Sequence, residues 1–353
     1  MKRKIKRGSD NCREQMLELK NREGKSLTLC LRQYRTGDES GIIDCIRDEY
    51  GDTYFKRDFY LPEQIQKEVR SGNITFLVAE TLSGEIAGML ILKQFYPRES
   101  MCELASQIFK KQYRGYGLAM PFFEYGMNIL KARHYSAAYC LPVLFHDTTQ
   151  RLLYRMGLRA TGFVLNVFHM EKITHSYKRD CNKKHSQGIQ IMAVEKRNAG
   201  TVYLPLEHRE FGRKVYDSLG VAYRIWEETK EEKPFGASKV EWKQDAVQSS
   251  LEIYIHRVGE DLSRRMEELH RKYPLTGMQT ANVFLNINDK NALWAYRVLT
   301  EMEYFFTGLK PLCSDREYMV LHNAGKVECF LDEYQLSEEF DRLRNYIKRG
   351  KKK

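Results

Sequence analysis

Two glycines separated by one residue lie in a stretch that could bind an anion. The stretch is residues 112–117, Gln-Tyr-Arg-Gly-Tyr-Gly, and its glycines are Gly115 and Gly117. It follows a run of strand-forming residues at 103–109 and precedes a run, 118–130, with apolar residues at helical spacing. The first N–H groups of a helix point outward at the positive end of its dipole, and glycine lets an anion approach them. The stretch is therefore predicted to bind a phosphate group, with a plain strand-to-helix turn as the alternative.

Length and composition indicate a folded protein of about two domains. The chain has 353 residues, of which 42% are hydrophobic and 12% aromatic. No apolar run approaches the roughly 18–20 residues that cross a membrane. No apolar signal segment follows the basic residues 1–7. These features predict a soluble cytoplasmic protein.

Cysteine spacing and charge argue against several classes of site. The eight cysteines form no C-x-x-C pair and no Cys/His grouping, so neither a metal site nor a disulfide framework is predicted. The net charge of +11 is partly concentrated at residues 2–7 and 348–353. Short basic ends without interleaved aromatic residues are more typical of solvated termini than of nucleic-acid binding. Nucleic acid is therefore not a favoured partner.

The order of predicted elements gives a mixed α/β layer. A strand is predicted at 26–35, helices begin near 39 and at Pro62, and a β-hairpin covers 74–80 and 86–95. The strand at 103–109 and the helix at 118–130 flank the glycine turn. A strand at 135–144, a helix at 146–156 and a strand at 158–170 complete this part.

This order, with a Q-x-x-G-x-G turn between the fourth strand and the third helix, resembles the GNAT superfamily of acetyl-CoA dependent N-acyltransferases. The resemblance covers about residues 27–170, and the Gly-Leu-Arg-Ala-Thr-Gly segment at 157–162 is similar to a conserved ending of that family. It implies that acetyl-CoA binds as co-substrate, with its pyrophosphate on the turn and its pantetheine arm beside the fourth strand. The implied binding residues are Gln107, Ile108, Phe109, Gln112, Tyr113, Arg114, Gly115, Tyr116, Gly117 and Leu118.

Acyl transfer to an amine needs a base, because an ammonium has no lone pair for attack. Glu103 is the first candidate, since strand alternation places it with Ala105, Gln107 and Phe109, and an exposed strand-edge charge is the alternative. In many family members a helix tyrosine four residues before the terminal glycine protonates the departing thiolate. Here Leu153 has that spacing, and Tyr154 lies one residue later. Tyr154 is therefore the candidate for this role, and the alternative is that Tyr154 is an ordinary packed tyrosine. Asp147 is expected to cap its helix.

The second half resembles a diverged copy of the first. Strands are predicted at 189–194, 221–226, 249–255 and 280–287, helices at 207–219, 260–272 and 291–302, and residues 304–308 are similar to the first terminal feature. Residues 256–261 take the place of the glycine turn, with one glycine and two carboxylates that would repel a pyrophosphate. The predicted division is a basic leader at 1–25, a GNAT domain at 26–172, a linker at 173–188, a degenerate GNAT-like domain at 189–335, and a C-terminal helix and basic tail at 336–353. Each domain is expected to hold a mixed, mostly antiparallel sheet flanked by helices.

The leading hypothesis is an N-acetyltransferase that moves an acetyl group from acetyl-CoA to a primary amine by direct attack in a ternary complex. A non-catalytic acyl-CoA sensor or interaction module is the alternative, favoured by the displaced tyrosine. The second half would shape the acceptor pocket or a subunit contact, and a homodimer is compatible with this. The sequence does not identify the acceptor.

Overall fold

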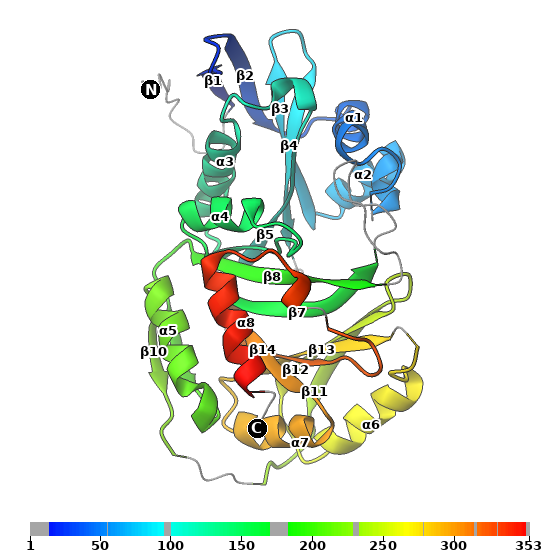
Figure 1. The fold of residues 1–353 in the computed structure, drawn as a ribbon, viewed down its shortest axis with the longest axis vertical. Coiled ribbons are helices and arrows are strands. Elements are labelled where there is room, and N and C mark those ends of the chain that lie inside the picture. Colours follow the sequence, from blue (N-terminus) through cyan, green and yellow to red (C-terminus); the bar gives the residue numbers. More distant parts are fainter. Residues whose placement is uncertain are drawn as a thin grey trace. The chain divides into compact units, whose positions relative to one another are not determined.

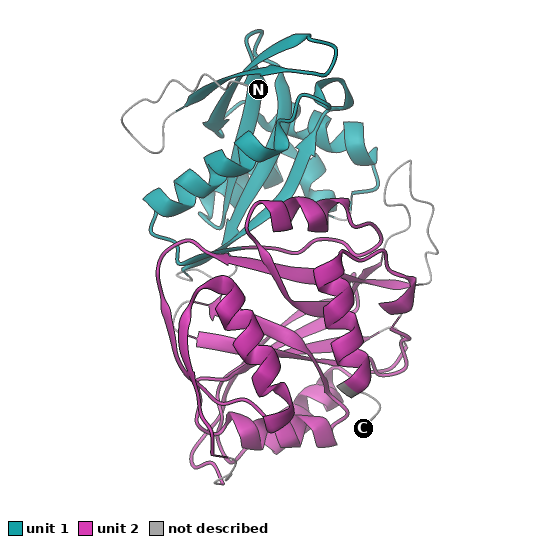
Figure 2. Ribbon diagram, turned by 60° about the vertical axis from the view of Figure 1, so that its left-hand side comes forward, with its two compact units in different colours: residues 1–138, 170–181 teal, residues 139–169, 182–353 magenta. Residues whose placement is uncertain are grey.

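The protein has two compact units, which are described separately (Figure 2). Unit 1 comprises residues 1–138 and 170–181, and unit 2 comprises residues 139–169 and 182–353. The computed structural model describes residues 14–54, 56–94, 100–169, 183–228, 233–277, 279–313, 316–329 and 331–350. This division differs from the boundary proposed from sequence, because residues 139–169 cluster with the second half.

Unit 1 is built on an antiparallel sheet with strand order β1-β2-β3-β4-β5 (Figure 1). The strands are β1 (Gln15–Lys20), β2 (Ser26–Gln33), β3 (Ile74–Thr81), β4 (Ile86–Gln94) and β5 (Met101–Phe109). The helices are α1 (Glu39–Tyr50), η1 (Arg57–Tyr60), α2 (Pro62–Arg70), η2 (Lys111–Tyr113) and α3 (Ala119–Ala132). A short strand, β6 (Ala137–Cys140), spans the division between the units.

Both faces of this sheet are buried, which explains the apolar runs in β3 and β4. One face packs against α1, η1 and α2 through a cluster that includes Phe76, Met89 and Ile108. On the other face, Leu90 and Leu104 lie near Gly126 of α3, and Figure 1 shows α3 across the sheet from α1 and α2. Burial on two sides makes β3 to β5 rigid supports for whatever lies at their ends.

Unit 2 contains a sheet with strand order β8-β7-β14-β15-β13-β12-β11 (Figure 1). Its strands are β7 (Arg159–His169), β8 (Lys184–Ala193), β11 (Lys239–Asp245), β12 (Ser250–Arg257), β13 (Thr280–Asn286), β14 (Phe305–Cys313) and β15 (Arg316–Asn323). Only β12 and β13 pair in parallel among these, and helix α6 (Leu262–Lys272) forms their crossover. The remaining elements are α4 (Thr148–Arg155), η3 (Leu206–His208), α5 (Arg209–Leu219), α7 (Ala292–Glu301), η4 (Leu331–Glu333), α8 (Glu338–Gly350) and the parallel pair β9 (Asn198–Val202) and β10 (Ala222–Ile225).

Two segments expected to be irregular form strands. The proposed leader contains β1, whose Leu17 and Leu19 are buried and which pairs with β2. The proposed linker ends five residues early, because β8 starts at Lys184 and pairs with β7; residues 170–182 lie outside the described residues. Lys184 is fully buried, and its ammonium donates to the Ser249 carbonyl at 2.7 Å and to Thr280 Oγ1 at 2.9 Å. Polar residues here form a strand because their side chains find buried partners.

The glycines of the two similar terminal segments meet within unit 2. Gly162 of β7 and Gly308 of β14 are antiparallel partners. A Cβ atom on Gly308, where φ is 140°, would lie 2.2 Å from the Gly162 Cα atom. Only glycine allows this approach. Strands β7 and β14 therefore approach each other at their glycines.

One carboxyl group lies in the interior of unit 2. Glu317 of β15 is 1% exposed, and its Oε2 accepts hydrogen bonds from the Leu312 N–H at 2.9 Å and the Tyr216 hydroxyl at 3.1 Å. Its Oε1 has no hydrogen-bond partner in the described part of the chain. Burial raises the pKa of Glu317 to about 7.

This carboxyl group predicts a pH-dependent stability. Between pH 4.5, its ordinary pKa, and about 7, the unfolded chain has lost the proton that the folded chain keeps, so stability falls as pH rises. The full shift corresponds to about 3 kcal/mol. We expect the Glu317→Gln variant to gain stability relative to the parent protein by about this amount between pH 5 and pH 8 in urea unfolding. A Glu317→Gln difference that stays constant across this range, as expected for the exposed control Glu63→Gln, would contradict the prediction.

Candidate functional site

The glycine turn connects the end of β5 to the start of α3. After Phe109, residues 111–113 form η2, and Leu118 is the N-cap of the 14-residue helix α3. Gly115 and Gly117 have φ of 85° and 72°, and a Cβ atom on either would meet nothing within 4 Å. The backbone conformation, rather than crowding by the protein, therefore requires glycine at both positions.

The backbone N–H groups of this turn divide into two sets. Those of Tyr113 and Arg114 are used inside the turn, where they donate to the carbonyls of Lys110 and Lys111 at 2.9 and 3.2 Å. For the N–H groups of residues 115–118, no acceptor is present among the residues that the structure describes. These groups precede the first turn of α3 and lie at its positive end. The N–H groups that remain available to an anion are therefore those of residues 115–118, a narrower set than the residues 112–118 indicated by the sequence.

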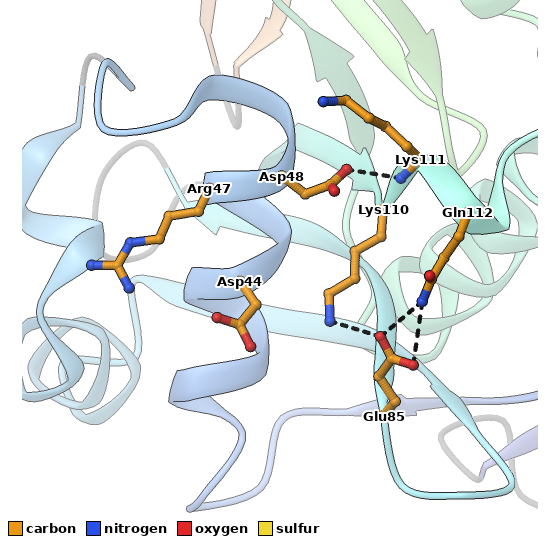
Figure 3. A pocket seen from close by; sticks show the side chains of 7 residues that line it. All are labelled: Asp44, Arg47, Asp48, Glu85, Lys110, Lys111 and Gln112. Carbon is orange, nitrogen blue, oxygen red and sulfur yellow. Dashed lines mark hydrogen bonds and ion pairs between the residues drawn. The ribbon is translucent and has the colours of Figure 1, made fainter.

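Two of the basic side chains near the turn, those of Lys110 and Arg114, are paired with carboxylates, and Figure 3 shows the Lys110 pair. Lys110 donates to Glu85 at 3.0 Å, and the side chains of Gln112 and Tyr113 donate to the same carboxylate. The Tyr113 hydroxyl, followed by the Lys110 ammonium, lowers the pKa of Glu85. Arg114, predicted to add positive charge, is paired with Glu49 and donates through Nε to the Phe109 carbonyl at 2.9 Å.

An open pocket of about 580 Å³ lies beside the turn (Figure 3). Its lining carries both signs of charge and consists of Asp44, Arg47, Asp48, Glu85, Lys110, Lys111 and Gln112. Asp48 accepts a hydrogen bond from the Lys111 N–H at 2.8 Å and so ties α1 to the turn. The pocket is polar, and its balanced charges alone select no ligand.

A bulge interrupts β5 before the turn. Met89 and Ile91 of β4 pair with Ile108 and Ala105, so two residues of β5 lie opposite one residue of β4. Ser106, at the bulge, has a φ of 50°, which is unusual for a residue with a side chain. Gln107 donates through Nε2 to the Ala119 carbonyl at 3.0 Å, which connects the bulge to the first turn of α3.

Because of the bulge, the residues that share a face of β5 differ from those predicted by simple alternation. Glu103 pairs with Lys93 and therefore shares a face with Ala105 and Ile108, rather than with Phe109 as simple alternation predicted. Phe109 lies on the α3 face, with its ring 5.8 Å from that of Phe122. One extra residue in a strand reverses the alternation beyond it.

The backbone N–H groups of Ile108 and Phe109 point in opposite directions. The Lys110 N–H donates to the Ala87 carbonyl of β4 at 3.0 Å. Because N–H directions alternate along a strand, the Ile108 N–H points toward β4 and the Phe109 N–H points to the opposite edge. Of these two N–H groups, only the Phe109 N–H can donate a hydrogen bond to a ligand that lies along the outer edge of β5.

Glu103 is buried and is not the exposed edge charge that was the alternative. It is 8% exposed, and its carboxylate lies 3.4 Å from the Lys93 ammonium. The buried phenol of Tyr54 lies on the same face, where burial, with a smaller contribution from the Glu103 charge, raises the pKa of Tyr54. A deprotonated Glu103 can accept a proton while Lys93 compensates its charge.

Tyr154 belongs to unit 2, whereas Glu103 and the glycine turn belong to unit 1. Its side chain is 47% exposed, and the Arg159 guanidinium lies 4.6 Å from the centre of its ring. Leu153, which has the spacing of the family tyrosine, is buried. Asp147 occupies the N-cap of α4 but makes no side-chain cap hydrogen bond and pairs with Arg151 at 2.6 Å.

The turn at residues 256–261, which was compared with the glycine turn on sequence grounds, uses its backbone N–H groups within the protein. Three consecutive N–H groups, of Val258, Gly259 and Glu260, donate to Asp289 Oδ2, Ser238 Oγ and Gly236 O at 2.7, 2.9 and 2.9 Å. A Cβ atom on Gly259 would lie 2.3 Å from the Gly236 carbonyl oxygen. Asp261 accepts from the Ser238 N–H at 2.6 Å, so the donors of this turn that are named here are used within the protein.

Sequence reasoning missed Tyr54 and Ser106, whose hydroxyl oxygens lie 2.6 Å apart at the bulge. A bulge has no residue pattern of its own in this strand, and only the register of β5 against β4 reveals it. Within the described residues, no group of three or more His, Cys, Asp or Glu side chains could hold a metal ion. No described helix has the length and apolar character needed to cross a membrane.

No family model matches the sequence, and no curated protein matches it. Solved structures similar to it include a variant of the spermidine N-acetyltransferase SpeG from Vibrio cholerae, with 16% identity, 47% of this chain and 94% of that chain covered, and a TM-score of 0.39. A ribosomal-protein alanine acetyltransferase from Vibrio fischeri has 9% identity, covers 47% and 93% of the two chains, and has a TM-score of 0.38. An N-acetyltransferase from Staphylococcus aureus Mu50 has 15% identity, covers 47% and 98%, and has a TM-score of 0.36. The proteins named here are N-acetyltransferases, and the likeness extends over about half of this chain.

The charge compensation at the turn makes a testable prediction. Glu85→Gln removes the carboxylate that occupies Lys110, Gln112 and Tyr113. We expect inorganic pyrophosphate to bind about 2- to 5-fold more tightly in isothermal titration calorimetry at low salt, because one nearby negative charge is lost. The gain should shrink as salt rises. Glu63→Gln, at an exposed position of α2, is the charge-matched control, and equal affinities of the two variants would contradict this account.

Proposed function

We propose that the chain is an N-acetyltransferase that moves an acetyl group from acetyl-CoA to a primary amine. The observation that carries the proposal is the turn at residues 115–118. It presents N–H groups without acceptors in the described structure, at the start of α3 and directly after a bulged strand. This arrangement suits a pyrophosphate at the turn with an extended arm running back along β5.

Acetyl-CoA, the acetyl donor, would contact the chain at two places. The N–H groups of residues 115–118 would hold the pyrophosphate, and Gln112, Tyr113 and Arg114 would shape the approach to it. Along β5, the Phe109 N–H faces the outer edge and is the better candidate of the two for hydrogen bonding to the arm or thioester. The Gln107 side chain fixes the distance between these places by holding the start of α3.

Transfer proceeds by direct attack of a neutral amine on the thioester carbon. The nitrogen–carbon bond forms, the carbon–sulfur bond breaks, and the proton of the amine passes to a base. Glu103 is proposed for that role, because it is buried on β5 with its charge compensated by Lys93. Tyr154 remains the sequence-based candidate for protonating the thiolate. Cys140 is buried, which disfavours a covalent intermediate on that thiol.

We further propose that residues 26–172 and 189–335 are tandem GNAT-like domains and that the second binds no coenzyme A at its own turn. Support comes from the internally bound N–H groups of Val258, Gly259 and Glu260. Pairing of Gly162 with Gly308 also supports a repeat, since the glycines of the two similar terminal segments are antiparallel partners. The second domain would then serve the acceptor or a subunit contact.

A non-catalytic acyl-CoA sensor is the second candidate. It is favoured by the displaced Tyr154, whose side chain is 47% exposed. In such a protein, acetyl-CoA binds and no thiol is released.

Thermal unfolding with acetyl-CoA tests both candidates. Ligand at about 100 times its dissociation constant should stabilise the native state by about 2.7 kcal/mol. Gly115→Val or Gly117→Val should abolish this, because a β-branched residue resists positive φ and obstructs the anion. Gly72→Val, at a φ of 76° and also in open space, is the control for backbone strain alone.

Three outcomes separate the proposals. Absence of stabilisation by acetyl-CoA would refute both the enzyme and the sensor. Stabilisation with thiol release from acetyl-CoA in the presence of a panel of primary amines supports the enzyme. Stabilisation without thiol release supports the sensor.

A further inference from the structure

The bulge in β5 is held from both faces of the sheet. On the α3 face, Gln107 donates to the Ala119 carbonyl at 3.0 Å. On the α1/α2 face, the Tyr54 and Ser106 hydroxyl oxygens lie 2.6 Å apart. Two consecutive residues of the bulge are therefore fixed by side-chain hydrogen bonds in opposite directions.

Tyr54 is the more firmly placed of the two hydroxyl groups. It is 2% exposed, and its ring packs against Tyr50 and Phe59 at centroid distances of 4.8 and 6.5 Å. Its backbone N–H donates to the Tyr60 hydroxyl at 3.0 Å. Burial also raises the pKa of Tyr54, so the phenol keeps its proton at neutral pH.

Either hydroxyl of this pair could donate the hydrogen bond, and the burial of the phenol favours Tyr54 as the donor. A protonated, buried phenol places its proton on an acceptor, and Ser106 Oγ is within reach. Ser106 is only half-buried, so its own hydroxyl proton can rotate away from Tyr54 toward the space beside the strand. When Ser106 Oγ accepts a hydrogen bond from Tyr54, the Ser106 hydroxyl becomes a better donor through hydrogen-bond cooperativity.

We propose that the Ser106 hydroxyl, oriented by Tyr54, donates a hydrogen bond to the acyl carbonyl oxygen of a bound acyl-CoA. The inference rests on the proposed function, which runs the acyl arm along β5 to this bulge. Ser106 is a catalytic residue in this scheme, since negative charge develops on the carbonyl oxygen during attack and the hydrogen bond then strengthens. Tyr54 is a positioning residue that acts through Ser106.

The proposal accounts for the backbone conformation of Ser106. A φ of 50° costs energy for a residue with a side chain, and such conformations concentrate at functional sites. In the extended conformation of an uninterrupted strand, the side chain of residue 106 would lie on the face opposite Ala105. The bulge instead brings it to Tyr54, on the face that also carries Glu103.

The test compares acetyl-CoA with CoA, which lacks the carbonyl group of the thioester. In calorimetric titrations, Ser106→Ala should weaken acetyl-CoA about 3- to 10-fold and leave CoA unchanged, the loss expected for one hydrogen bond. Tyr54→Phe should weaken acetyl-CoA by a smaller factor. The double variant with Tyr54→Phe and Ser106→Ala should have the same ratio of acetyl-CoA affinity to CoA affinity as Ser106→Ala alone. Tyr34→Phe, in the same aromatic cluster but away from the bulge, is the control.

A second readout reports on the carbonyl itself. The stretching band of acetyl-CoA labelled with ¹³C at the carbonyl should shift to lower frequency on binding to the parent protein. The shift should be reduced in Ser106→Ala, which a merely structural role for this residue would not produce. An unchanged affinity ratio and an unchanged band in that variant would overturn the inference. Failure of both acetyl-CoA and CoA to bind the parent protein would instead refute the proposed function.

Discussion

The pairing of β5 with β4 is the constraint on which the rest of unit 1 depends. Gly88 pairs with Phe109 and Lys93 with Glu103, and the extra residue between these pairs reverses the faces of the strand. As a result, Phe109 packs toward α3 while Glu103, Ala105 and Ile108 face α1 and α2. Because of the extra residue, the Phe109 N–H points to the outer edge of β5. The glycine turn begins directly after this part of the strand.

The turns at residues 115–118 and 258–260 differ in how their backbone N–H groups are hydrogen-bonded. At residues 115–118 the glycines adopt positive φ, and the N–H groups have no acceptor within the described structure. At residues 258–260 the N–H groups are bound by Asp289, Ser238 and Gly236. Buried backbone donors must be satisfied, and a chain that satisfies them itself removes the attraction for an anion.

Charge in unit 1 is compensated in pairs. Arg32 is 3% exposed and donates to both oxygens of Asp38 at 2.7 and 2.8 Å, and to Glu80 at 2.7 Å. Glu103 has Lys93 as its counter-ion, and Glu85 has Lys110. Under the proposed function, attraction for an anion would come mainly from the oriented N–H groups of residues 115–118.

Local sequence determined the elements whose pattern is complete within one short stretch. Alternating leucines predicted β2, apolar spacing predicted α1 and α3, and Gly115 and Gly117 marked the turn, because each of these signals reflects the conformation of its own residues. The charged strand β1, the start of β8 at Lys184 and the bulge at Ser106 depended on partners distant in the chain: β2, Ser249 with Thr280, and β4 with Tyr54. Such features are decided by which distant groups meet in the folded protein, so only the tertiary structure could place Ser106 against Tyr54 and reverse the face of Phe109.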